Sequence, residues 1–267
     1  MTYQVVDLLA LMQRLRDPKQ GCPWDISQTF KSIVPHTLEE CYELVDAIEQ
    51  GDTKHIKEEL GDVFFQVVFY AQLAAEQQDF DFSDVVDSLT EKLIRRHPHV
   101  FPGGQLNSGV DQQHVDTKVV KEQWEAIKSI ERKNKQQHSI LDDIPQALPA
   151  QTRAYKLQKR ASNAGFDWPN IDGALEKLHE EIGELIDAKN SQKQDAIEDE
   201  MGDVLFSCIN IARHLQVDPE QALRRTNRKF EQRFGYVEAV LKQREENLGD
   251  VGLVRLEALW QEAKAKV

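Results

Sequence analysis

Apolar residues recur at helical spacing along much of the chain. In the first half they follow one another every three or four residues from Leu38 to Ile48, and Gly51 and Asp52 then interrupt the pattern. A second run begins near His55, and its centre, VFFQVVFYAQLA, is apolar almost all round, as expected for a helix inside a bundle. A strand is the competing interpretation for so many Val and Phe residues, but the preceding acidic EEL and the length of the run favour a helix. The pattern predicts two helices joined by a short turn.

The same pattern occurs twice in the chain. Residues 39–75 and 180–216 align without a gap at an offset of 141 residues and are identical at 13 of 37 positions, where average composition would give about two. In the second copy the break falls at Asn190 and Ser191. Two copies indicate two homologous modules rather than a solenoid, which usually needs three or more units.

A further helix is predicted after each pair. One covers Phe82 to Arg96, with Ser83 as its candidate N-cap, and the other covers Asp218 to Leu241, with Pro219 in the first turn. We find no convincing pattern of strands joined by hairpin turns. The expected fold is therefore all-α, with two tandem modules of the four-helix-bundle type, each built on an antiparallel helical hairpin.

The boundaries between the modules are expected in a polar segment that contains Pro145 and Pro149. We assign 1–132 to the N-terminal module, 133–150 to a linker and 151–267 to the C-terminal module.

Charge and composition exclude several classes of protein. Lys and Arg total 33 against 46 Asp and Glu, so the net charge of −13 argues against a protein that binds nucleic-acid polymers. No apolar run approaches the roughly 20 residues of a membrane helix, and the first residues do not resemble a signal peptide, so we expect a cytoplasmic protein with no membrane partner. The three cysteines form no Cys-x-x-Cys pair and are expected to be free thiols, with Cys41 and Cys208 in the core.

Carboxylates recur at the same places in both copies. Residues three or four apart share a helix face, so Glu40 aligns with Glu43, and Glu59 aligns with Asp62. The antiparallel packing of a short hairpin can then bring four carboxylates into one small volume. The shared acids are Glu39, Glu40, Glu43, Glu59 and Asp62 in the first copy, and Glu180, Glu181, Glu184, Glu200 and Asp203 in the second.

Such a cluster is unfavourable without cations. At ~5 Å and an effective dielectric constant of ~20, each pair of like charges costs about 3 kcal/mol. Either several acids are protonated or hard cations lie among them, and a donor set made only of oxygens predicts Mg²⁺, with Mn²⁺ as a substitute. An ordinary solvated helix face is the plainer interpretation. It is disfavoured because the acids adjoin a strongly apolar run and recur at the same spacing.

Basic and aromatic residues complete the candidate site. Lys229 and Arg233 are four apart on the predicted helix after the second copy, where they could hold the far end of a polyphosphate. Lys177 lies one turn before Glu181 on the same face. Lys92 and Arg96 hold a place after the first copy similar to that of Lys229 and Arg233, and either Trp124 or Trp260 could stack on a base or simply pack.

The duplicated motif resembles a known family. EExxE followed after fifteen residues by ExxD, present twice, is similar to the pattern of the MazG family of all-α nucleoside triphosphate pyrophosphohydrolases. The resemblance covers essentially the whole chain in the long, two-module bacterial layout. It includes RLRDPKQGCPWDISQTF near the start, RRHPHVF in the middle and NAGFDW before the second copy.

The resemblance implies hydrolysis of standard and modified NTPs and dNTPs between the α- and β-phosphates. The products would be a nucleoside monophosphate and pyrophosphate, Mg²⁺ would be required, and a homodimer would be the usual assembly. Family analogy places catalysis in the C-terminal module, but the intact acids of the first copy, with Lys92 and Arg96, leave a second site open. By motif position the metal ligands would be Glu181, Glu184, Glu200 and Asp203, and the substrate would be bound by Lys177, Glu180, Lys229, Arg233 and Trp260.

Two alternatives belong to other classes of function. A carboxylate-bridged di-iron bundle requires a Glu-x-x-His motif on each of two helices. Glu176 and His179 fit once, but Pro35 and Leu38 stand at the corresponding positions of the first copy. A catalytically silent nucleotide sensor or partner-binding scaffold is the other alternative, and it would bind nucleotide without releasing pyrophosphate.

Overall fold

The computed structural model describes residues 2–107, 116–134 and 139–266. Within these residues all regular structure is helical, which confirms the predicted all-α class. Contacts divide the chain into Met1–Ile130 and Glu131–Val267, and each unit is described by itself below. The predicted boundary at residue 132 and linker at 133–150 stay predictions, and residues 135–138 of that linker lie outside the described part.

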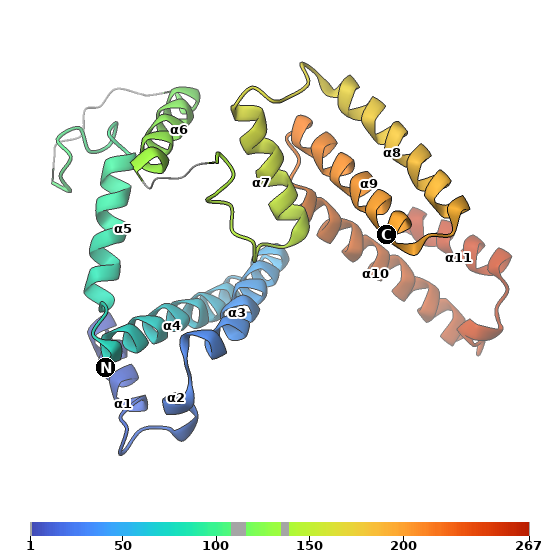
Figure 1. Ribbon diagram of the computed structural model, residues 1–267. Helices are drawn as coiled ribbons and strands as arrows, with labels where there is room; N and C mark the ends of the chain where they lie inside the picture. Colours follow the sequence, from blue (N-terminus) through green and yellow to red (C-terminus); the bar gives the residue numbers. More distant parts are fainter. Residues whose placement is uncertain (1, 108–115, 135–138, 267) are drawn as a thin grey trace. The chain divides into compact units, whose positions relative to one another are not determined.

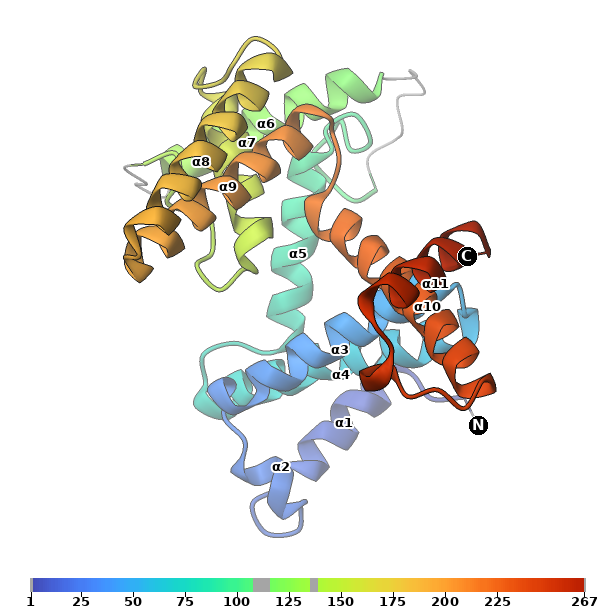
Figure 2. The same ribbon diagram turned by 90° about the vertical axis from the view of Figure 1, so that its right-hand side faces the viewer.

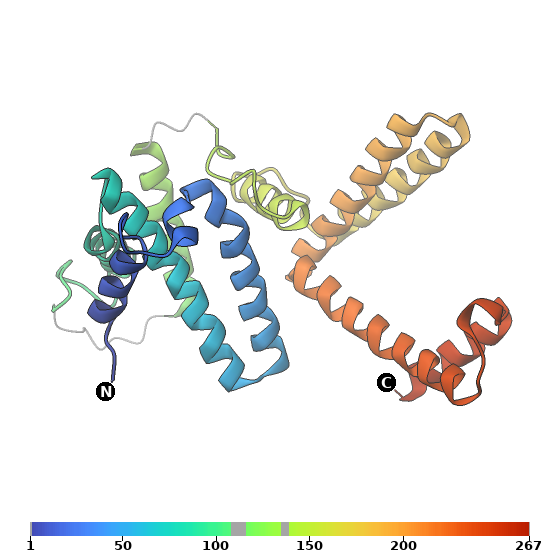
Figure 3. The ribbon, with the colours of Figure 1, turned by 90° about the horizontal axis from the view of Figure 1, so that it is seen from below.

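The N-terminal unit is built on an antiparallel helical hairpin of α3 and α4 (Figure 1, Figure 3). Helices α1 and α5 pack against α4. The helices are α1 (Val5–Leu15), α2 (Pro23–Ser27), α3 (Phe30–Gln50), α4 (Thr53–Gln77), α5 (Phe82–Arg96) and α6 (Thr117–Asn134), the last of which runs past the unit boundary.

The turn between α3 and α4 follows directly from its residues. Gly51 ends α3 in the left-handed conformation (φ 76°), which glycine adopts without a steric penalty. Asp52 then caps α4, because its carboxylate accepts hydrogen bonds from the backbone N–H groups of Lys54 and His55. The predicted break is therefore confirmed, and α4 begins two residues earlier than expected.

The core of this unit lies between α1, α3 and α4. Met12, Ile33 and Phe69 are buried there with partly buried aromatic residues around them. The other side of the hairpin is uncovered within the unit, and Val67 is 39% exposed although its helix is apolar almost all round. The expectation that α4 lies wholly inside a bundle is therefore wrong for this unit taken alone.

The C-terminal unit contains a second hairpin of the same kind, formed by α8 and α9 (Figure 1). Helices α7 and α10 pack against α9, and α10 pairs with α11 (Figure 2). Its helices are α7 (Ala150–Asn163), α8 (Ile171–Ser191), α9 (Gln194–His214), α10 (Pro219–Gln243) and α11 (Leu253–Lys266), with a 3₁₀ turn, η1, at Leu248–Asp250.

The two hairpins keep the register of the sequence repeat. Helix α8 begins 141 residues after α3 (171 against 30), and α9 begins 141 residues after α4 (194 against 53). The caps correspond as well: Thr29 and Asn170 cap the first helices, and Gly51 and Gln192 end them in the left-handed conformation. The predicted internal repeat is thus a repeat of structure.

Some details differ from the expectations. The N-cap of α5 is Asp81 rather than Ser83, because the Asp81 carboxylate accepts from the N–H groups of Ser83 and Asp84. All three cysteines are free, as expected, but Cys41 and Cys208 are exposed on the hairpins instead of buried, since neither hairpin is covered on all sides within its unit. No helix among the described residues has the length and apolar character needed to span a bilayer.

Candidate functional site

Three of the predicted acids of the second copy converge in the C-terminal unit. Glu181 and Glu184 lie on one face of α8 and Glu200 faces them from α9, so that one oxygen of each lies within 4.8 Å of the other two. Glu181 is only 5% exposed, Glu200 is half-buried and Glu184 is exposed. A single hard cation can bridge oxygens at this separation, because its ligand oxygens lie about 2–2.6 Å from it.

Asp203 stands apart from these three. It lies one turn after Glu200 on α9 and is exposed, but it does not belong to the set whose oxygens all lie within 4.8 Å of one another. It lines the cavity next to the cluster instead. Its assignment as a fourth metal ligand stays a prediction.

The electrostatics of the cluster are those of crowded like charges. Partial desolvation raises the pKa of Glu184, and the neighbouring charges of Glu181 and Glu200 raise it further. The negative charges of these carboxylates repel one another, and a hard divalent ion bound to their oxygens would neutralise them. A donor set made only of oxygens therefore fits Mg²⁺ or Mn²⁺.

Lys177 supplies positive charge to the same cluster. Its Nζ lies 2.7 Å from Oε1 of Glu181 and 3.0 Å from Oε1 of Glu180, both on the same helix. Hydrogen bonds to Glu181 and then to Glu180 raise the pKa of Lys177. A lysine in this position can turn toward an incoming phosphate, since its side chain is more than a third exposed.

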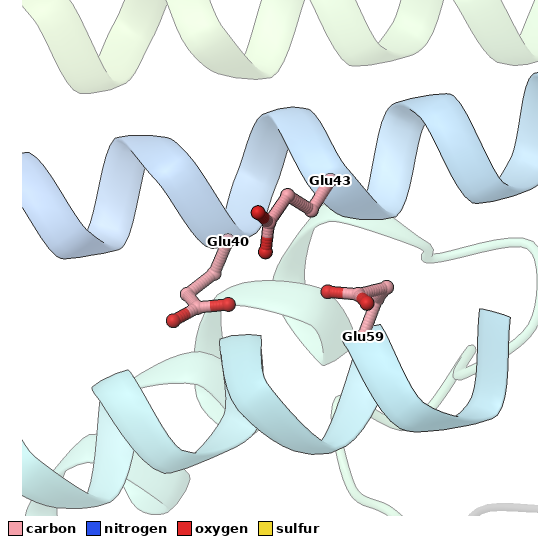
Figure 4. Close-up of side chains that lie close together, drawn as sticks. All are labelled: Glu40, Glu43 and Glu59. Carbon is pink, nitrogen blue, oxygen red and sulfur yellow. The ribbon is translucent and has the colours of Figure 1, made fainter. Parts of the chain in front are cut away.

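The N-terminal unit holds a matching cluster. Figure 4 shows Glu40 and Glu43 on α3 close to Glu59 on α4, and one oxygen of each lies within 4.8 Å of the others. Burial raises the pKa of Glu40 most, and the negative charge of Asp62 raises it further. Asp62 itself does not belong to the three acids whose oxygens lie within 4.8 Å of one another. Glu59 is 8% exposed; its Oε1 lies 2.8 Å from Nε2 of His55, and its buried Oε2 has no hydrogen-bond partner in the described part of the chain.

The predicted phosphate-binding residues lie on the helices that follow each hairpin. Lys229 is exposed and Arg233 is half-buried on α10, and Nε of Arg233 is buried without a hydrogen-bond partner in the described part of the chain. Lys92 and Arg96 are half-buried on α5. Their roles toward a phosphate chain stay predictions.

The two candidate base-stacking tryptophans differ in their surroundings. Trp260 on α11 is half-buried, with its ring 5.3 Å from that of Phe230, and it packs against the buried cluster of α10 and α11. Trp124 on α6 has Lys128 Nζ 4.3 Å above its ring. Their roles in base binding remain untested predictions.

A cavity of about 690 Å³, which the sequence pattern does not predict, adjoins the C-terminal cluster. Glu181 and Asp203 lie at its wall, as does Lys177. The remaining lining comes from α7, α9, the segment before α8 that carries NAGFDW, and Leu141 in the segment before α7. That segment supported the family resemblance, but nothing in its sequence spacing indicated that Phe166 and Trp168 would face a cavity.

An ionic network holds this segment against α9. The Asp167 carboxylate accepts hydrogen bonds from Arg213 (2.8 and 2.5 Å) and from Ser162 Oγ (2.7 Å), and His214 Nε2 lies 3.2 Å away. The hydrogen bond from Arg213, with further help from Ser162 and His214, lowers the pKa of Asp167 to about 2. The network fixes the backbone next to Trp168.

This network makes a testable contribution to stability. Because the folded-state pKa of Asp167 lies below its ordinary value of 3.8, the stabilisation is fully present above pH ~4 and is lost as the pH falls toward 2. We expect Asp167→Asn to lower the free energy of unfolding by about 1–2 kcal/mol at pH 7, the side chain being 23% exposed. The difference from the unsubstituted protein should shrink as the pH falls from 4 to 2.5, as measured by denaturant unfolding. Asp187→Asn, an exposed change of the same charge on α8, is the control, and an equal, pH-independent effect of both variants would contradict the assignment.

Comparison with known proteins agrees with this geometry. A family model described as the MazG nucleotide pyrophosphohydrolase domain matches residues 28–101 and 171–238, which contain both clusters. The chain is 48% identical over 263 residues to a nucleoside triphosphate pyrophosphohydrolase of Escherichia coli, covering 98% of this chain and 97% of that protein. It is 42% identical over 261 residues (97% and 94%) to the nucleoside triphosphate pyrophosphohydrolase/pyrophosphatase MazG of Thermotoga maritima. With both acidic hairpins matched and the similarity extending over nearly its full length, the chain belongs to the MazG family of nucleotide pyrophosphohydrolases.

Proposed function

We propose that this protein hydrolyses nucleoside triphosphates to nucleoside monophosphates and pyrophosphate in a Mg²⁺-dependent reaction, and that the C-terminal unit carries the catalysis. The observation that supports this most is the convergence of Glu181, Glu184 and Glu200 next to a cavity that is large enough for a nucleoside and that Glu181 itself lines. The relatives that match over nearly the whole chain are named for the same reaction. We propose both NTPs and dNTPs as substrates, with broad base specificity that includes modified nucleotides.

The protein's own residues divide the work between the two ends of the triphosphate. Glu181, Glu184 and Glu200, with Asp203, would hold Mg²⁺, with Mn²⁺ as a substitute. When bound, the metal supplies Lewis acidity that activates water and offsets phosphate charge. Lys177 exchanges its contacts with Glu180 and Glu181 for the incoming phosphate, while Lys229 and Arg233 neutralise the departing pyrophosphate.

A homodimer is the assembly that we propose. Each hairpin leaves large apolar side chains exposed within its own unit, which is unfavourable in water and typical of an interface. A second copy of the chain offers the same apolar surface in return, as a two-fold interface requires. The exposed residues include Leu38, Tyr42, Ile48 and Leu60 on the first hairpin, and Ile182, Ile186, Met201 and Leu205 on the second.

The products of the reaction test this function. We expect a panel of NTPs and dNTPs to yield equal amounts of nucleoside monophosphate and pyrophosphate, resolved by anion-exchange chromatography, and only when Mg²⁺ or Mn²⁺ is added. Release of inorganic phosphate and a diphosphate would contradict cleavage between the α- and β-phosphates. Tight nucleotide binding with no product would favour the silent sensor or scaffold.

A further inference from the structure

The most buried acid of the C-terminal cluster is paired with a cation that belongs to the chain itself. Glu181 is 5% exposed, and a carboxylate removed from water to this extent is unfavourable unless a positive charge compensates it. Nζ of Lys177 lies 2.7 Å from Oε1 of Glu181 and supplies that charge. The two residues are four apart on α8, so the helix itself brings them together.

The positive charge of Lys177 also reaches the rest of the cluster. Desolvation raises the pKa of Glu184 most and the charge of Glu181 raises it further, whereas the charge of Lys177 opposes them. Lys177 therefore offsets part of the repulsion that a divalent ion would otherwise relieve. Because like charges repel, an ion bound to the same oxygens would be disfavoured while the ammonium group stays beside Glu181. The lysine and the metal compete for one carboxylate.

Lys177 has a second place to go. Its side chain is 37% exposed, and the residue lines the cavity next to the cluster. An ammonium group on a flexible four-carbon stem can turn from Glu181 toward a phosphate oxygen without a movement of α8. Its departure alone would leave Glu181 buried without a compensating charge. The lysine should therefore leave Glu181 when a metal ion takes its place there.

The first copy of the repeat lacks this lysine. By the offset of 141 residues, Glu181 corresponds to Glu40 and Lys177 corresponds to His36. Nδ1 of His36 lies 3.7 Å from Oε2 of Glu39, the residue before Glu40. Burial raises the pKa of Glu40 most, and neighbouring acids raise it further. The competing lysine thus belongs to the copy to which catalysis is assigned.

We propose that Lys177 is a switch between the two ligands of the C-terminal site: it holds Glu181 until a divalent ion displaces it, and it then binds the phosphate chain. This rests on the proposed function, which supplies both the ion and the polyphosphate. Only the fraction of molecules in which Lys177 has released Glu181 can accept the ion, so the free ion binds weakly. A nucleotide removes this penalty by giving the ammonium group a new partner, and metal and nucleotide bind with positive coupling.

Binding of Mn²⁺ alone tests the first half of the switch. The ion is titrated into the full chain carrying Glu40→Gln and Glu43→Gln, so that the N-terminal cluster does not contribute, and free Mn²⁺ is followed by electron paramagnetic resonance. We expect Lys177→Met to tighten Mn²⁺ binding about 10-fold, and Lys177→Gln to do the same. The matched control is Lys189→Met, which removes the same charge from an exposed position of α8 and should change the affinity less than about 2-fold.

Nucleotide binding tests the second half. A nucleoside triphosphate with a methylene group between its α- and β-phosphorus atoms, which is not cleaved there, is titrated at saturating Mn²⁺ by isothermal titration calorimetry. We expect Lys177→Met to weaken this nucleotide at least about 10-fold, because the phosphate chain loses a cation. The same variant then binds the metal better and the nucleotide worse. A general loss of structure would weaken both.

The outcomes that overturn the switch are distinct from a failure of the proposed function. Unchanged or weaker Mn²⁺ binding in Lys177→Met would refute it, as would unchanged nucleotide binding or a chain that binds no Mn²⁺ at this cluster. Equal tightening in Lys189→Met would show an effect of net charge and also refute it. Opposite shifts of metal and nucleotide affinity in a protein that releases no pyrophosphate would support the switch and overturn the hydrolysis instead.

Discussion

Replacing Glu200 by Gln and Asp203 by Asn together should reduce turnover at least about 10³-fold while the helices remain folded. The amides keep the shape of the side chains but remove two of the negative charges that would hold the metal and position the triphosphate. The fold should survive, because the two residues are half-buried and exposed on the hairpin surface rather than in the apolar core. Steady-state pyrophosphate release and far-ultraviolet circular dichroism measure the two effects.

The same double variant should be at least as stable to denaturation as the unsubstituted protein. The charge of Glu200 is one cause of the raised pKa of Glu184, so its removal relieves repulsion within the cluster. The matched control is Glu59→Gln with Asp62→Asn, which makes the same change at the corresponding positions of the first copy. We expect the control to retain turnover, because catalysis is assigned to the C-terminal unit. Full activity of the Glu200 and Asp203 variant would refute that assignment.

The second large effect is expected at Arg16, in the N-terminal unit. Its guanidinium is buried and donates to Glu76 from Nε and Nη2 (2.8 and 2.7 Å) and to the backbone carbonyl oxygens of Asp25 and Gln28. It also lies over the ring of Phe69, 5.3 Å from the centroid. One side chain therefore ties the end of α1 to α2 and to the end of α4.

Arg16→Met should destabilise the N-terminal unit by about 3 kcal/mol, because it removes the ion pair of Glu76 and leaves the carbonyl oxygen of Asp25 with only the N–H group of Gln28 as donor. Hydrogen–deuterium exchange of peptides from α1 and α2 should then accelerate about 100-fold. Arg14→Met, on the same helix but exposed, is the control. Similar exchange in both variants would show that the buried ionic contacts contribute little.

The repeat explains why so much of the fold could be predicted. Residues that set the hairpin turn, such as Gly51 and Asp52, act locally, so their effect is visible in the sequence. The spacing of Glu181, Glu184 and Glu200 likewise needs only helical periodicity and a short turn to bring the acids together. The same reasoning placed Asp203 with them; this residue lines the adjoining cavity, and its assignment as a metal ligand stays a prediction.

The cavity could not be predicted by the same means. Gln158, Trp168 and Asn210 belong to three separate segments, and their proximity depends on how α7 and the loop before α8 pack against α9. Asn210 in an otherwise apolar stretch, where the first copy has Phe69, is the signal that could have been noticed. The exposure of Cys41 and Cys208 was missed for a related reason: helical periodicity shows which residues share a face, but not whether that face is covered.

The two units therefore share a scaffold and differ in what surrounds the acids. Both clusters crowd three carboxylates within 4.8 Å, and in both a carboxyl pKa is raised by burial and neighbouring charge. In the second copy a lysine, Lys177, forms an ion pair with Glu181 of the cluster. The first copy has His36 at the matching position.

We propose that the carboxylates of α8 and α9 hold a divalent ion. The most direct test is a crystal grown with Mn²⁺ and measured at the manganese absorption edge. We expect an anomalous peak about 2.2 Å from carboxylate oxygens of Glu181, Glu184 and Glu200. Carboxylates that point apart into solvent, with no peak among them while Mn²⁺ binds elsewhere, would contradict it.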